Sequence, residues 1–161
     1  MKSKAIFLDR DGVINHERGD YVWLVDDLII NDGVVEFLQE LRSRDYLFFI
    51  ITNQSGISKE LYTHEDVNEV HRYIKDHFAI YGIRFTEIYY CPHHPTVTHC
   101  LCRKPGSLLV EKAVARFNVD PAQSYFIGDR ERDVEAAKGT GVNPILIPSN
   151  APLGDYLSMI A

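Results

Sequence analysis

Long apolar runs, an excess of cationic residues and a disulfide framework are all missing from this sequence. No apolar run approaches the roughly 20 residues that a membrane-spanning helix needs, so we expect no membrane association. Lys and Arg total 17 against 23 Asp and Glu, which gives a net charge of −6. This balance disfavours a general binder of nucleic acids or anionic membranes. An anionic ligand would instead need a local cationic site or a metal ion.

The N-terminus lacks the pattern of a targeting segment. The apolar run 5–8 is too short for a signal-peptide core, and Asp9 ends it at once. We therefore expect a cytoplasmic protein. The 161 residues fit one domain, and no repeat, linker or low-complexity tract divides them. Residues 1–161 are predicted to form a single domain, which we expect to be a monomer.

Short apolar runs alternate with longer amphipathic segments along the chain. Brief apolar runs predict strands at 5–8, 47–51, 88–90, 125–127 and 144–147. Apolar residues at helical spacing predict helices at about 33–44, 63–78, 107–117 and 131–138. This alternation indicates an α/β fold with a doubly wound parallel sheet and helices on both faces. Such sheets bind their ligands at the carboxyl ends of the strands.

Polar residues stand where four of these strands are followed by loops. They are Asp9 and Asp11, then Thr52, Asn53, Gln54 and Ser55, then Arg103 and Lys104, and finally Asp129 with Asp133 on the next helix. The topology is expected to bring them to one crevice. Clustered carboxylates repel one another unless a cation lies among them, and all-oxygen ligation favours Mg²⁺. Lys104 and Arg103 suit the oxygens of a phosphate.

The run Phe7-Leu8-Asp9-Arg10-Asp11-Gly12 resembles the opening motif of the haloacid dehalogenase superfamily of phosphatases. Thr52-Asn53, Lys104 and Gly128-Asp129 with Asp133 resemble its later motifs, in order, and the resemblance spans about residues 5–147. It implies a Rossmann-like core and hydrolysis of a phosphomonoester through a phospho-aspartate. A response-regulator receiver domain also uses Asp, Thr and Lys, but it carries its phospho-acceptor after the third strand, where this chain has Cys91.

The resemblance also implies a role for each residue of the site. Asp9 is expected to be the nucleophile and Asp11 the acid/base, with Thr52 and Lys104 completing the catalytic set. Asp9, Asp129 and a backbone carbonyl near Asp11 are expected to ligate Mg²⁺, supported by Asp133. Substrate contacts are expected from Asn15, Asn53, Gln54, Ser55, Arg103 and Arg130.

Three cysteines and several histidines cluster within the segment 91–104. One His and three thiolates make a closed tetrahedral set, as in structural zinc sites. A zinc-binding loop placed just before Arg103-Lys104 resembles that of the subgroup that contains heptose 1,7-bisphosphate and histidinol-phosphate phosphatases. That resemblance implies Cys91, His93, Cys100 and Cys102 as the Zn²⁺ ligands. It also implies that the fold has no large cap domain and that the loop at 15–31 and the zinc loop shape the substrate pocket.

The substrate is expected to be a small phosphate ester. The motifs around Asp20-Tyr21, Thr52–Ile57 and Tyr89–Pro95 favour heptose 1,7-bisphosphate. The short zinc loop, with six residues between His93 and Cys100, is closer to the histidinol-phosphate enzymes, which are the alternative. Two other functions are possible alternatives. An inactive zinc-stabilised binding module is disfavoured by the intact set of site residues, and a polynucleotide 3′-phosphatase is disfavoured by the acidic pI of about 5.6.

Overall fold

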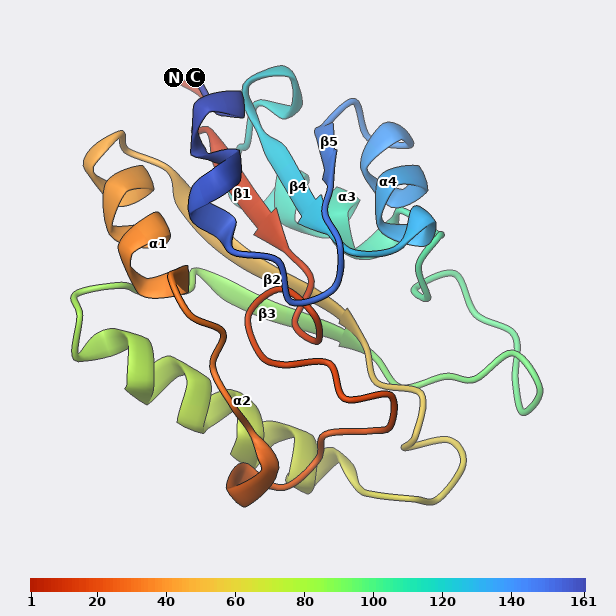
Figure 1. Ribbon diagram of the computed structural model, residues 1–161. Coiled ribbons are helices and arrows are strands. Elements are labelled where there is room, and N and C mark those ends of the chain that lie inside the picture. Colours follow the sequence, from red (N-terminus) through yellow and green to blue (C-terminus); the bar gives the residue numbers. More distant parts are fainter.

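All five predicted strands are present in the computed structural model, which describes residues 1–161. They are β1 (Ala5–Leu8), β2 (Leu47–Asn53), β3 (Glu87–Cys91), β4 (Tyr125–Gly128) and β5 (Asn143–Leu146). They form one parallel sheet in the order β3-β2-β1-β4-β5 (Figure 1). The first strand is therefore central, and Phe7 lies in register beside Phe49 and Phe126.

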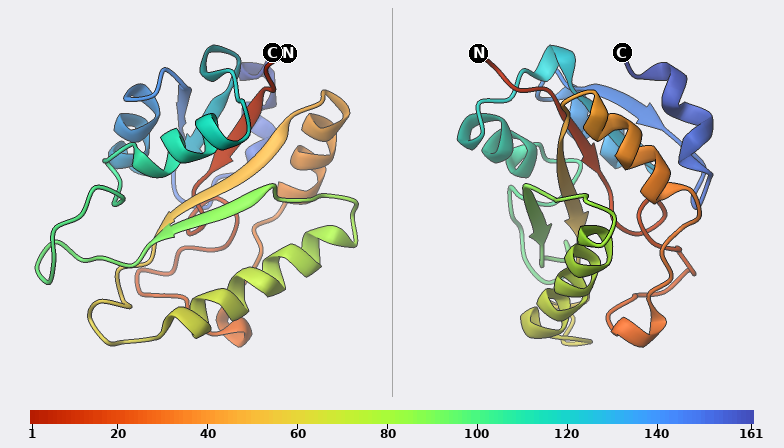
Figure 2. Two further views of the ribbon diagram at one scale, coloured as in Figure 1. Left: turned by 180° about the vertical axis from the view of Figure 1, so that it is seen from behind. Right: turned by 90° about the vertical axis from the view of Figure 1, so that its left-hand side faces the viewer.

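Four α-helices cover the sheet: α1 (Val34–Ser43), α2 (His64–Ala79), α3 (Leu108–Arg116) and α4 (Glu131–Lys138). α1 and α2 lie on one face, and α3 and α4 on the other (Figures 1 and 2). The predicted doubly wound architecture is thus confirmed. α2 begins at a capping box in which the Thr63 side chain accepts from the Asp66 N–H and Asp66 accepts in return.

The sheet separates two hydrophobic cores because side chains of a strand alternate between its faces. Ile6 and Leu8 of β1 face the core beneath α1 and α2. Ala5 and Phe7 face the smaller core beneath α3 and α4. All four side chains are fully buried, so β1 is a rigid base for the residues that follow it.

Three short 3₁₀ helices lie outside the predicted elements: η1 (Val25–Asp27), η2 (Pro121–Gln123) and η3 (Leu153–Met159). η3 carries the C-terminal segment back over the α1 side, where Leu153 and Ile160 join the larger core. Its residues lack a clear helical period, so sequence reasoning left them unassigned. No large cap domain interrupts the sheet, as expected. None of the helices is both long and apolar enough to cross a membrane.

The loops that matter for function all leave the carboxyl edge of the sheet. The segment 9–31 follows β1, 54–63 follows β2, and 92–107 extends away from the body after β3 (Figure 1). The structure therefore brings the polar residues of the sequence motifs to one edge, as parallel topology requires.

Candidate functional site

A carboxylate cluster lies at the carboxyl ends of the two adjacent strands β1 and β4. Oxygens of Asp9, Asp129 and Asp133 all lie within 4.8 Å of one another. Gly12, with φ of +89°, makes this approach possible, since a Cβ there would clash with the Asp129 carboxylate. Asp133 reaches the cluster from the first turn of α4, where it also accepts a hydrogen bond from the Arg130 N–H at 3.2 Å. It thus caps its helix and contacts the cluster.

Lys104 places a buried cation inside this cluster. Its Nζ donates to Asp9 Oδ1 at 2.9 Å and to the Ile51 carbonyl at 2.7 Å, and it pairs with Asp133 Oδ1 at 2.6 Å. The lysine is only 1% exposed. Burial by itself lowers the pKa of Lys104, but the two carboxylates outweigh burial and hold the pKa above its ordinary value. Lys104 is therefore a permanent positive charge next to Asp9.

The cluster still carries more negative charge than Lys104 balances. Burial raises the pKa of Asp9 to about 8, with Lys104 opposing the rise and the neighbouring carboxylates adding to it. Buried oxygens Asp129 Oδ1 and Asn15 Oδ1 have no hydrogen-bond partner. Both features fit a binding site for a cation, and a set of oxygen donors suits a hard ion such as Mg²⁺. Asp9 and Asp129 are the residues that could hold it.

Asp11 lies beside this cluster but has different partners. Its Oδ1 accepts from Arg10 Nη2 at 2.9 Å, from Arg10 Nε at 3.3 Å and from Asn15 Nδ2 at 3.0 Å. Its Oδ2 accepts from Gln54 Nε2 at 3.1 Å. Burial raises the pKa of Asp11, but Arg10 and these hydrogen bonds outweigh burial, so the pKa lies below its ordinary value. In the resting site Asp11 is a carboxylate.

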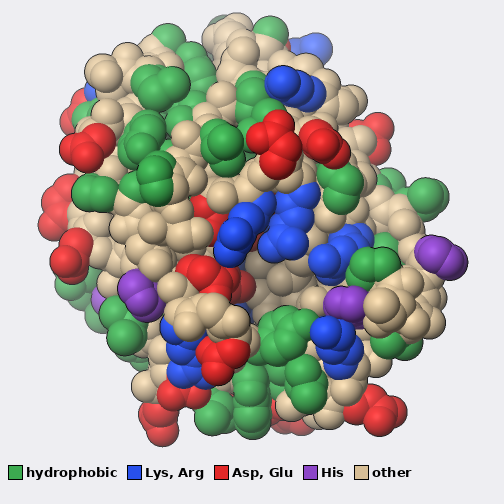
Figure 3. Space-filling view, turned by 45° about the vertical axis from the view of Figure 1, so that its right-hand side comes forward, with side chains coloured by type: hydrophobic (Ala, Val, Ile, Leu, Met, Phe, Trp, Pro, Cys, Tyr) green, Lys and Arg blue, Asp and Glu red, His purple; other side chains and the backbone are tan.

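A polar pocket of about 390 Å³ opens above these carboxylates. Asp9, Asp11 and Asp129 line this pocket, and so do Arg103 and Arg130, which were predicted to contact the substrate. On the face drawn in Figure 3, Lys and Arg side chains gather around a central hollow. The protein is acidic overall, so this local concentration of arginine marks a site for an anion.

The other residues predicted to contact the substrate differ in what their side chains hydrogen-bond. Ser55 lines the pocket, where its Oγ lies 3.3 Å from the Tyr21 hydroxyl. Asn53 also lines it, but its amide exchanges two hydrogen bonds with the Lys104 backbone. Asn15 is fully buried and donates to Asp11. The Asn53 amide and the Asn15 Nδ2 therefore hydrogen-bond to Lys104 and Asp11 instead of being free for a ligand in the pocket.

Thr52 and Gln54 form a second buried layer. Gln54 Nε2 donates to Thr52 Oγ1 at 3.0 Å as well as to Asp11, and Gln54 Oε1 accepts from the Tyr62 hydroxyl. Thr52 is 1% exposed and does not line the pocket. The amide of Gln54 is thus committed to the protein, and its predicted contact with substrate would have to replace one of these bonds.

Two pocket residues, Arg132 and His94, were missed by sequence reasoning. Tyr21 also lines the pocket, and it belongs to the loop 15–31 that was expected to shape it. The Arg132 Nε is buried without a partner. Arg132 stands one residue before Asp133, and this position next to the fourth motif was the signal that could have indicated it. Nothing in the local pattern distinguishes His94 from an ordinary loop residue.

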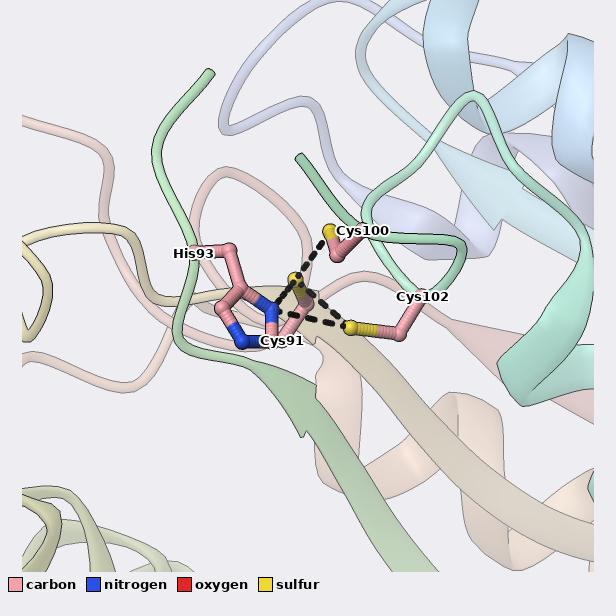
Figure 4. Close-up of side chains that lie close together, drawn as sticks. All are labelled: Cys91, His93, Cys100 and Cys102. Carbon is pink, nitrogen blue, oxygen red and sulfur yellow. Dashed lines mark hydrogen bonds between the residues drawn. The ribbon is translucent and has the colours of Figure 1, made fainter. Parts of the chain in front are cut away.

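The predicted zinc ligands converge at the base of the long loop after β3 (Figure 4). Cys91 Sγ lies 3.7 Å from Cys100 Sγ and 3.0 Å from Cys102 Sγ. His93 presents Nδ1, at 3.4 Å from Cys91 Sγ and 3.2 Å from Cys102 Sγ. A tetrahedron with Zn–S bonds of about 2.3 Å has S–S edges of about 3.8 Å, so the four atoms fit one tetrahedral ion slightly contracted. Burial and the adjacent Cys102 raise the pKa of Cys91, a cost that a bound cation would remove.

Comparison with known proteins gives the family to which this site belongs. The family described as haloacid dehalogenase-like hydrolase matches residues 3–141. The chain belongs to the haloacid dehalogenase-like hydrolase family. This membership agrees with the fold, with the order of the four motifs and with the carboxylate cluster at the strand ends.

Relatives and solved structures within the family point in one direction. The chain is 39% identical over 157 residues to the D-glycero-alpha-D-manno-heptose-1,7-bisphosphate 7-phosphatase of Campylobacter jejuni, covering 97% of this chain and 89% of the relative. It is 38% identical to the beta-anomer enzyme of Haemophilus ducreyi, covering 88% and 81%. The D,D-heptose 1,7-bisphosphate phosphatase of B. bronchiseptica, solved with magnesium and phosphate, superposes with a TM-score of 0.85 at 31% identity, covering 97% and 86%.

Proposed function

We propose that this hydrolase is a magnesium-dependent phosphatase that removes the 7-phosphate of D-glycero-D-manno-heptose 1,7-bisphosphate. The observation that carries the proposal is the juxtaposition of Asp9, Asp129 and the buried Lys104 beneath an arginine-lined pocket. The relatives act on this sugar bisphosphate and match over most of both chains, which supports the substrate.

The contacts of Asp9 suit it to act as the nucleophile. Both of its hydrogen bonds, from Lys104 Nζ and the Arg10 N–H, go to Oδ1, which leaves Oδ2 to attack phosphorus. The new Oδ2–P bond forms as the P–O bond to the sugar breaks, giving an aspartyl-phosphate. Lys104 would stabilise the negative charge of the phosphoryl oxygens, assisted by Arg103 from the pocket wall.

Asp11 supplies and removes the protons in this scheme. It gives a proton to the leaving sugar oxygen in the first step and takes one from the attacking water in the second. Water then breaks the Asp9–P bond and releases phosphate, which regenerates the Asp9 carboxylate and leaves Asp11 protonated. Release of that proton to solvent restores the Asp11 carboxylate. The lowered pKa of Asp11 favours the carboxylate that the second step needs, so proton uptake must precede the first.

Asp9 and Asp129, with a backbone carbonyl near Asp11, would hold Mg²⁺, and Asp133 would support the site through Lys104. When bound, the ion would neutralise part of the charge of the phosphoryl group. The partnerless Asp129 Oδ1 and the raised pKa of Asp9 support this assignment.

Zn²⁺ on Cys91, His93, Cys100 and Cys102 would be structural. The four ligands fill a tetrahedron and leave no position for a reactive water. The loop then connects directly to Arg103, whose Nη1 donates to the His93 carbonyl at 3.3 Å. In this proposal residues 1–161 form a single phosphatase domain, and the loop 91–104 holds Arg103 and Lys104 in place.

The pocket suits a substrate with two anionic ends. Arg130 and Arg132 line the pocket together with Arg103 and could contact the phosphate that is retained. Histidinol phosphate is the second candidate, because the short loop between His93 and Cys100 favours it. Its cationic amino group would have to lie among these arginines, which disfavours it.

Substrate panels test the proposal directly. We expect kcat/KM to be highest for one anomer of heptose 1,7-bisphosphate, at least about tenfold above histidinol phosphate, since a lost charge pair costs about that factor. Activity should require Mg²⁺. A preference for histidinol phosphate would overturn the substrate, and phosphate release unaffected by EDTA would overturn the metal. The further predictions of a cytoplasmic monomer without nucleic-acid partners can be examined by sedimentation and by cell fractionation.

A further inference from the structure

A buried arginine–histidine pair lies behind Asp11 and is used by none of the steps above. Arg10, between the two aspartates of the first motif, is fully buried, and His71 of α2 is only 5% exposed. Arg10 Nη1 and His71 Nε2 are 3.3 Å apart. Since a guanidinium only donates hydrogen bonds, His71 Nε2 is the acceptor, and its ring is neutral with the proton on Nδ1.

Every edge of the Arg10 guanidinium has a partner. Nη2 and Nε donate to Asp11 Oδ1, Nη2 also donates to the Val22 carbonyl at 2.6 Å, and Nη1 donates to His71. A buried charge is retained at low cost only when it is paired and hydrogen-bonded in this way. The guanidinium therefore links the Asp11 carboxylate to the loop after β1 and to α2.

The His71 ring is itself fixed. It meets the ring of Tyr90 on β3 edge-on, with centroids 5.7 Å apart. Because Tyr90 of the sheet holds the His71 ring, His71 Nε2 fixes the position of Arg10 Nη1. The guanidinium is planar and rigid, so fixing Nη1 also fixes its Nη2 and Nε. Nη2 and Nε are the atoms that donate to Asp11.

The two oxygens of Asp11 are not equivalent as a result. Oδ1 accepts three hydrogen bonds, two from Arg10 and one from Asn15, whereas Oδ2 accepts one, from Gln54. Three donors leave Oδ1 with no lone pair directed at a substrate. Oδ2 retains one, and Asp11 lines the pocket.

We propose that Arg10 and His71 are positioning residues that hold the Asp11 carboxylate so that Oδ2 is the oxygen that exchanges protons with the substrate and water. This inference rests on the proposed acid–base role of Asp11. His71 touches no reacting atom and acts only through Arg10. Its contribution should therefore appear where proton transfer limits the rate.

His71 variants in the full-length, magnesium-loaded enzyme test the pair without removing a charge. His71→Leu removes the acceptor, His71→Gln keeps an acceptor at a similar reach, and Ile74→Val perturbs the same helix in the core without touching Arg10. Each is assayed on 4-nitrophenyl phosphate, whose leaving group needs no proton, and on a sugar phosphate, whose leaving group does.

We expect His71→Leu to lower kcat on the sugar phosphate by about 10-fold to 10²-fold, since misplacing a catalytic group by about 1 Å costs up to that much. On the aryl ester the loss should be several times smaller, KM should stay unchanged, and His71→Gln should recover most of the rate. Equal losses on both esters, or a Gln variant as slow as the Leu variant, would overturn the pair, as would a His71→Leu enzyme with wild-type rates.

Asp11→Asn separates this inference from the proposed function. A loss concentrated on the sugar phosphate supports the acid–base role, and the His71 variants then decide the pair alone. An equal loss on both esters removes proton donation by Asp11 to the leaving group, and this inference with it, while Asp9-dependent phosphatase activity would still stand. A wild-type enzyme that releases no phosphate from either ester would instead overturn the proposed function.

Discussion

The carboxylate cluster and the cysteine loop are both rich in possible metal ligands, and Lys104 of the cluster follows Cys102 of the loop by two positions. The two regions are nevertheless stabilised in opposite ways. The carboxylates stand on the ends of buried strands and include their own cation, Lys104, 1% exposed. The cysteine loop has no cation among its thiols, and its apolar residues Val97 and Leu101 are exposed. The first region therefore contains a cation that balances part of its charge, whereas in the second a bound metal ion would supply the order that packing does not.

This contrast separates chemistry from support. In the carboxylate cluster, a metal ion would complete a charge balance that Lys104 already begins. In the loop, a metal ion would replace the packing that a hydrophobic core provides elsewhere. Removing one metal or the other should therefore change different observables.

The largest effect is expected from Asp9→Asn. The amide can still accept from Lys104, so we expect the fold and melting temperature to be nearly unchanged. It cannot form an acyl phosphate, so kcat should fall by at least about 10³-fold. Asp76→Asn, an exposed substitution on α2, is the matched control. Appreciable turnover in the Asp9 variant, measured by phosphate release, would contradict the assignment of the nucleophile.

Lys104→Met tests whether the carboxylates depend on their resident cation. The variant leaves Asp9 and Asp133 buried without a cationic partner, which costs about 3–5 kcal/mol in proteins where one side of a buried pair is removed. Mg²⁺ should recover part of this loss, so its addition should raise the melting temperature more in the variant than in the wild type. Denaturant unfolding with and without Mg²⁺ measures both quantities. An equal response to Mg²⁺ in the two proteins would show that Lys104 does not balance the cluster.

The double variant Cys100→Ser/Cys102→Ser addresses the loop. We expect zinc content to fall, hydrogen exchange of residues 92–103 to rise, and kcat/KM to fall by about 10²-fold because Arg103 and Lys104 lose their position. Protection of β1 and β2 should be unchanged. Thr98→Ala, in the same loop but not a ligand, is the control. If elemental analysis finds no stoichiometric zinc in the wild-type protein, the assignment of a zinc site to this loop is wrong.

Strand-forming runs and polar strand ends made the sheet and most of the site predictable, because both depend on local pattern and on one rule of parallel topology. Contacts between distant segments were not predictable. Arg10 and His71 are 61 positions apart. Helical spacing places His71 on the apolar face of α2 with Val67 and Ile74, but nothing local indicates that its partner is Arg10. The use of Asn53 to hold the Lys104 backbone, rather than substrate, likewise depends on a contact across 51 positions.

The smallest expected effect concerns acid stability and separates the Asp11 side of the site from the zinc loop. Burial, together with Arg10 and Lys75, lowers the pKa of His71 to about 3 against the opposing effect of Asp11. Between pH 6.5 and about 3 the unfolded chain therefore binds a proton at this position that the folded chain does not. Stability must fall as the pH drops through this window, and above about 6.5 the effect vanishes.

At pH 5, which is about 1.5 units below the ordinary histidine pKa, the loss should be about 2 kcal/mol relative to pH 7.5. His71→Gln cannot titrate and should lose about that much less over the same interval. Zinc release in acid should affect both proteins equally, so the difference between their unfolding free energies isolates His71. Parallel pH profiles for the two proteins would mean that His71 takes up its proton in the folded state. The neutral ring on which Arg10 and Asp11 depend would then be absent, and the contrast between a carboxylate site with a buried cation of its own and a thiol-rich loop without one would rest on Lys104 alone.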